Sequence, residues 1–81
     1  MKIPVVKKLV EEYSSIQLQE AEEAILEENA PSIEVEGEDE GEQLTHIMAA
    51  IWIQEKMKMG VDFKIALREY TGKVRNSISL D

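Results

Sequence analysis

The segment from Ile47 to Ile53 is apolar on nearly every side of a helix, and this limits what the chain can fold into. Apolar residues recur at helical spacing along about five turns, at Leu44, Ile47, Met48, Ile51, Trp52 and Met57. Ala49, Ala50 and Ile53 fill the other side, so this helix must be buried on more than one face. Three neighbouring helices could barely cover it, which makes a subunit interface a natural alternative to burial within one chain.

The chain is short and has no cysteine, so its fold depends on packing alone. A single domain of 81 residues builds one small core, which supplies roughly a few kcal/mol of net stability. Without cysteine there is no disulfide framework and no thiolate site for zinc. We therefore expect a homodimer, since self-association would complete the burial of the long helix.

Capping signals divide the rest of the chain into helices. Ser14 and Gln17 form a capping box, and Pro4 suits the first turn of a helix. Gly60 is placed to end the long helix in a left-handed conformation, and Asp62 is placed to cap the next one. The sequence predicts an all-α domain of four antiparallel helices with a long central third helix, at residues 3–13, 15–29, 39–59 and 63–79.

Two short features fit this helical pattern less well. The acidic loop 30–38 has only Ile33 and Val35 as large apolar residues, and as a lone strand it would need a partner from a second subunit. Gly72 interrupts the apolar pattern of the last helix at a cost of about 1 kcal/mol relative to alanine. Either two helices approach closely at Gly72, or the end of that helix is weakly held.

Charge is divided sharply along the chain. Between Lys8 and Lys56 there are fourteen carboxylates and no lysine or arginine, and the net charge of the whole chain is -8. This balance argues against binding to nucleic acid, which requires basic residues at the phosphates. Residues 56–81 carry six bases against three acids, so the last helix could pack antiparallel on the acidic second helix, within one chain or across a dimer.

The apolar segments are too short for a membrane role. The run from Ile47 to Ile53 cannot span a bilayer, and the first residues lack the apolar region of a secretory signal. We therefore expect a cytoplasmic protein without a membrane partner.

One cluster could bind a cation. Glu38, Glu42 and His46 are spaced four residues apart and would line one face at the start of the long helix, where carboxylate and imidazole groups could ligate a metal. The alternative is an ordinary acidic first turn with an adjacent histidine. No arrangement of nucleophile and base indicates catalysis, so we expect no catalytic residues, no enzyme activity and no cofactor.

The long helix also carries the candidate interface. Methionine and tryptophan give it an adaptable apolar stripe that could receive a partner helix, although the same residues also fill ordinary cores. The candidate interface residues are Leu44, Ile47, Met48, Ile51, Trp52 and Met59.

Both ends of the chain resemble a family of short uncharacterised bacterial proteins, a domain of unknown function. The resemblance rests on the opening residues 2–9 (KIPVVKKL) and on the spacing of Gly60, Asp62, Ala66, Leu67, Val74, Ser77 and Ile78. It is weakest between Gln17 and Glu42. The resemblance implies a small, stand-alone, helical cytoplasmic protein and supplies no catalytic residues.

These observations favour a non-enzymatic, acidic interaction or regulatory domain that acts as a homodimer and that could also bind an unidentified protein partner. The alternative is a protein that binds a divalent metal or small ligand through Glu38, Glu42 and His46.

Overall fold

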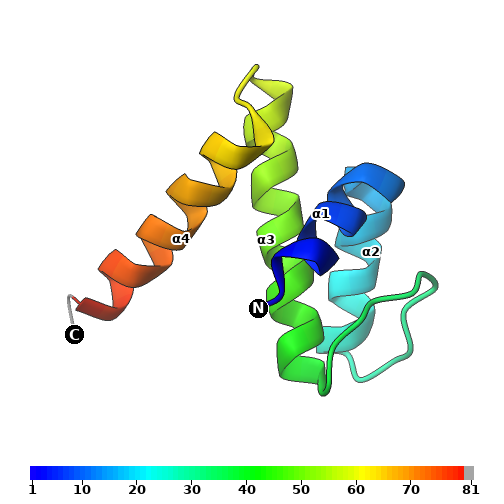
Figure 1. Ribbon diagram of the computed structural model, residues 1–81. Coiled ribbons are helices and arrows are strands. Elements are labelled where there is room, and N and C mark those ends of the chain that lie inside the picture. Colours follow the sequence, from blue (N-terminus) through cyan, green and yellow to red (C-terminus); the bar gives the residue numbers. More distant parts are fainter. Residues whose placement is uncertain (80–81) are drawn as a thin grey trace.

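The described residues fold as four helices, with the third at the centre. The computed structural model describes the backbone of residues 1–79 and the side chains of residues 1–72. Figure 1 shows α1 and α2 on one side of α3, and α4 on its other side. The predicted all-α class, the four helices and the central third helix are confirmed, with bounds α1 (Ile3–Glu12), α2 (Ser15–Leu26), α3 (Glu40–Lys58) and α4 (Phe63–Ser79).

Local signals set the start of α2 and both ends of α3. Ser14 Oγ accepts the Gln17 N–H at 3.2 Å, and Gln17 Oε1 accepts the Ser14 N–H at 2.9 Å, which completes the predicted capping box. Asp39 Oδ1 accepts the Glu42 N–H at 2.8 Å at the start of α3. Gly60 follows the end of α3 with φ +91°, a conformation that glycine adopts without steric cost.

Helix α2 ends at Leu26, three residues earlier than the sequence predicts. Glu28 adopts φ +62°, and the Asn29 N–H donates to the Ala24 carbonyl at 2.7 Å, as in a Schellman ending. This ending turns the chain away before Asn29. A non-glycine residue in the left-handed region gives no sequence signal, which explains the difference.

Apolar packing and hydrogen bonds attach the acidic loop before α3 to the body. The Val35 side chain is buried, and the Gln43 Nε2 amide donates to the Val35 carbonyl at 3.2 Å. Residues 30–38 form no strand in the structure, and Ile33 is half-buried at the edge of the core. The loop therefore needs no second subunit to pair with.

The core is centred on α3. Ile47, Ala50 and Ile53 have no exposed surface, and helices α1, α2 and α4 each pack against this helix. Side chains from the first two helices complete one side of the core, at Val5, Val6, Leu9, Val10, Leu18, Ala21 and Ile25. No helix in the part of the chain that the structure describes is long and apolar enough to cross a bilayer.

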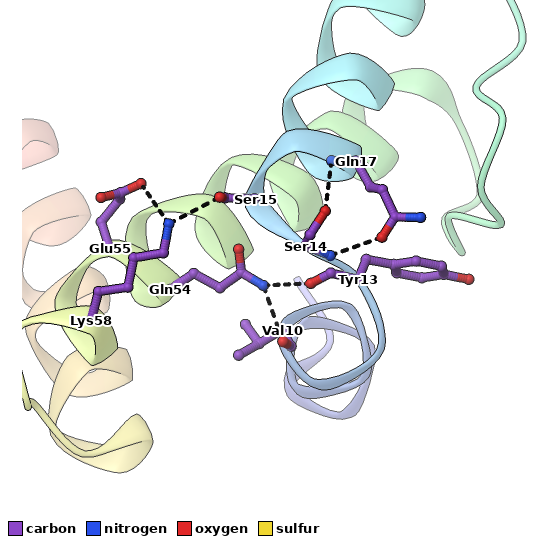
Figure 2. A network of polar contacts seen from close by, with 8 residues as sticks. All are labelled: Val10, Tyr13, Ser14, Ser15, Gln17, Gln54, Glu55 and Lys58. Carbon is purple, nitrogen blue, oxygen red and sulfur yellow. Dashed lines mark hydrogen bonds and ion pairs between the residues drawn. The ribbon is translucent and has the colours of Figure 1, made fainter.

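Gln54 connects α3 to the junction between α1 and α2 by two hydrogen bonds. Its Nε2 amide donates to the Val10 carbonyl at 3.0 Å and to the Tyr13 carbonyl at 2.7 Å, both at the C-terminal end of α1 (Figure 2). On the next turn Lys58 Nζ donates to Ser15 Oγ at 2.9 Å. The two hydrogen bonds from Gln54 satisfy carbonyls that the end of α1 would otherwise leave unpaired.

We predict that Gln54→Ala lowers the free energy of unfolding by about 1–3 kcal/mol, because it removes two hydrogen bonds to carbonyls at the end of α1. Urea unfolding followed by circular dichroism measures this loss. Gln19→Ala, at an exposed position of α2, is the control and should change stability by less than about 0.5 kcal/mol. Equal effects of the two substitutions would contradict this role for Gln54.

Candidate functional site

Helix α4 contacts the rest of the described fold through α3 and diverges from it along its length. Figure 1 shows its C-terminal half standing apart from the other helices. The prediction that α4 packs on α2 within one chain is therefore wrong, because α1 and α2 occupy the opposite side of α3. Of the basic residues assigned to this helix, Lys64 and Arg68 are exposed, whereas the side chains of Lys73 and Arg75 lie outside those described.

The divergence leaves an apolar hollow between α3 and α4. The hollow has a volume of about 360 Å³ and is the candidate functional site of this protein. Met48 lies on α3 and is 47% exposed, although it is a large apolar side chain. We call this site the α3–α4 hollow; the residues that line it are Met1, Thr45, Met48, Tyr70 and Thr71.

An aromatic pair joins α3 to α4 beside the hollow. The rings of Trp52 and Tyr70 are tilted by 56° with centroids 5.6 Å apart, a favourable geometry for two aromatic rings. Lys56 Nζ lies 5.1 Å from the centroid of the Trp52 ring, within the range of a cation–π contact. Partial burial raises the pKa of the Tyr70 hydroxyl, because desolvation disfavours the phenolate.

The raised pKa of Tyr70 predicts that strong alkali weakens the contact between α3 and α4. The unfolded chain releases the tyrosine proton near pH 10, so the contribution of Tyr70 is complete below that pH and is lost as pH rises through the higher folded-state pKa. Unfolding free energies measured from about pH 8 to about pH 12 test this.

Tyr70→Phe should remove that part of the alkaline loss, and Tyr13→Phe, on the opposite side of the molecule, should retain it. An identical alkaline profile for wild type and Tyr70→Phe would refute the effect.

The candidate interface residues differ in how deeply they are buried and in whether they line the hollow. Ile47 is completely enclosed by its own chain, so its assignment to an interface is corrected to the core. Leu44, Ile51 and Trp52 are half-buried and pack against the core from its edge. Met59 is 73% exposed after the end of α3 but does not line the hollow. Of this set, Met48 is the residue that lines the hollow.

Gly72 lies next to the hollow and has no close neighbour. A Cβ atom built on Gly72 would meet no atom of the described residues within 4 Å. Of the two explanations that the sequence offers, close approach of another helix is therefore absent among the residues that the structure describes. Glycine in the middle of α4 lowers the stability of the helix relative to alanine, and no close contact in the described fold offsets this loss.

His46 is buried and makes two backbone hydrogen bonds. Its side chain has no exposed surface, its Nε2 accepts the Lys2 N–H at 2.9 Å, and its Nδ1 lies 2.8 Å from the Glu36 carbonyl oxygen. Because Nε2 is the acceptor, the proton lies on Nδ1 and is donated to Glu36. The histidine thus joins the N-terminus and the acidic loop to α3.

Two of the three candidate metal ligands already make hydrogen bonds to backbone groups. Both ring nitrogens of His46 are engaged, so neither offers a lone pair to a cation. Glu42 Oε1 accepts the Glu38 N–H at 2.9 Å, and the Glu38 side chain is exposed. Within the described residues, no group of three or more histidine, cysteine, aspartate or glutamate side chains is arranged to hold a metal ion.

We predict that His46→Ala lowers the free energy of unfolding by about 2–4 kcal/mol, because it leaves a cavity and removes both bridging hydrogen bonds. Gln19→Ala, at an exposed position of α2, is the control and should change stability by less than about 0.5 kcal/mol. Chemical denaturation of both variants measures the difference, and a stability of His46→Ala equal to that of wild type would exclude a bridging role.

Sequence reasoning did not identify Met1, Tyr70 and Thr71 as residues of the site. Tyr70 belongs to the apolar spacing of α4, which marks it for packing but not for a surface hollow. Met1 and Thr71 carry no local signal, because only the packing of α1 and α4 against α3 brings them to one place.

Comparison with known protein families matches residues 1–79 to a family of unknown function, DUF6952. No curated protein matches the chain. No solved structure matches it either.

Proposed function

This chain belongs to the DUF6952 family of unknown function, and because that membership assigns no activity, we propose a function from the chain's own surface. The protein is a small, acidic, non-enzymatic interaction module of the cytoplasm that acts as a homodimer. Its binding surface is the α3–α4 hollow, and the occupant is a second copy of the chain.

The observation that carries this proposal is the exposure of apolar side chains at the hollow. Met48 and Met1 are both more than two-fifths exposed and line the same site. Methionine adapts its shape to a partner, and exposed apolar groups gathered around a hollow are typical of interaction surfaces. A small domain gains stability by covering such a surface.

Charge favours a second copy as the occupant. Helix α4 carries four basic residues and one acid, whereas residues 1–62 carry five basic residues against fifteen acidic ones. Two identical chains therefore offer each other surfaces of opposite sign, and a symmetric contact uses that complementarity twice.

Sedimentation equilibrium across a wide range of protein concentration tests the proposal. Wild type should self-associate, and Met48→Glu should remain monomeric at every concentration because it places a charge in the apolar hollow. Ile16→Glu is the matched control: Ile16 is 66% exposed on α2, and this variant should associate like wild type.

Circular dichroism checks that both variants keep the helical content of wild type. A wild-type protein that stays monomeric throughout, or a Met48→Glu variant that associates like wild type, would overturn the proposal.

A further inference from the structure

We infer that the element of the second copy that fills the α3–α4 hollow is its α4, and that Gly72 is where helices of the two copies approach most closely. This inference rests on the proposed function, because it names the part of the partner that occupies the same site. By two-fold symmetry, each copy inserts its own α4 and receives the α4 of the other.

Gly72 provides the first argument. Glycine inside a helix destabilises it relative to alanine, and a reason for glycine is the close approach of another backbone. Within one copy nothing approaches this position, since an added Cβ would meet no described atom within 4 Å. The adjacent residues Tyr70 and Thr71 line the hollow, so a helix seated there would pass beside Gly72.

The geometry of α4 provides the second argument. This helix contacts α3 through its first half, where Ala66 is buried and Leu67 is half-buried. Its second half stands apart from the other helices in Figure 1. In the sequence, Val74 and Ile78 continue the apolar spacing of Tyr70 into that half, although their side chains lie outside those described. A helix that extends beyond its own body can reach the body of a second copy.

Charge around the hollow provides the third argument. Thr45 lines the hollow, and Glu42 lies one turn earlier on the same face of α3. The incoming helix is basic, with Lys64 and Arg68 exposed on its first half. The Glu42 carboxylate beside the hollow and a basic incoming helix attract one another at low salt and less so at high salt.

The decisive experiment compares Gly72→Ala with wild type by measuring monomer stability and dimer dissociation constant on the same preparations. In the free chain the added Cβ enters open space and improves helix propensity, so the thermal stability of the monomer at high dilution should rise. In the dimer the same Cβ meets the partner helix, so the dissociation constant should rise by roughly tenfold or more. The two effects have opposite signs, which a general loss of folding cannot produce.

Gln19→Ala is the control, since Gln19 is an exposed, uncharged position of α2, on the other side of α3, and does not line the hollow. This variant should leave the dissociation constant within about twofold of wild type. The wild-type dimer should also dissociate more readily as sodium chloride is raised.

The outcomes separate this inference from the proposed function. If wild type never dimerises, both fall. If wild type dimerises and Met48→Glu abolishes the dimer, but Gly72→Ala associates as tightly as wild type, another element of the partner fills the hollow and only this inference falls.

Discussion

Burial of Ile47, Ala50 and Ile53 along α3 is the interaction on which the arrangement of the other helices depends. Each of α1, α2 and α4 packs against α3, and the side chains at the centre of α3 have no exposed surface. Ala49 and Ala50 are buried on this helix, and larger side chains of α1 and α2 complete the core around them. The fold is therefore organised around one helix rather than as a bundle of equal members.

The connections between elements are made by polar groups at the edge of this core. Gln54 holds the C-terminal end of α1, and His46 holds the N-terminus and the acidic loop. Both side chains bond to backbone groups that helix ends and loops leave without intrahelical partners. The chain has no cysteine and therefore no disulfide. These hydrogen bonds hold the end of α1, the N-terminus and the acidic loop, which have little apolar surface to bury.

The two sides of α3 are covered unequally, and this inequality connects the fold to the proposed function. Helices α1 and α2 both pack on one side, whereas α4 covers the other only near the α3–α4 turn and then diverges. The resulting hollow keeps Met48 accessible next to the Trp52–Tyr70 pair. The α4 helix of a second copy would cover this side of α3. It would approach the first copy most closely at Gly72, where glycine has no side chain.

The sequence by itself determined the elements of this protein. Helical periodicity, the Ser14–Gln17 capping box, the Asp39 cap and the Gly60 ending are local, so they identified four helices and the central position of the third. The observed end of α2 differs from the predicted one because Glu28 adopts a left-handed conformation, which a glutamate in the sequence does not predict.

Tertiary structure alone decided which faces meet. Ile47 and Met48 are adjacent in the sequence and both apolar, yet one is enclosed and the other is nearly half exposed, because the packing of the other three helices decides which faces of α3 are covered. The burial of His46 likewise depends on Lys2 and Glu36, which come from distant segments. Such long-range placement leaves no trace in local spacing, and so the candidate metal cluster and the hollow could be judged only from the folded chain.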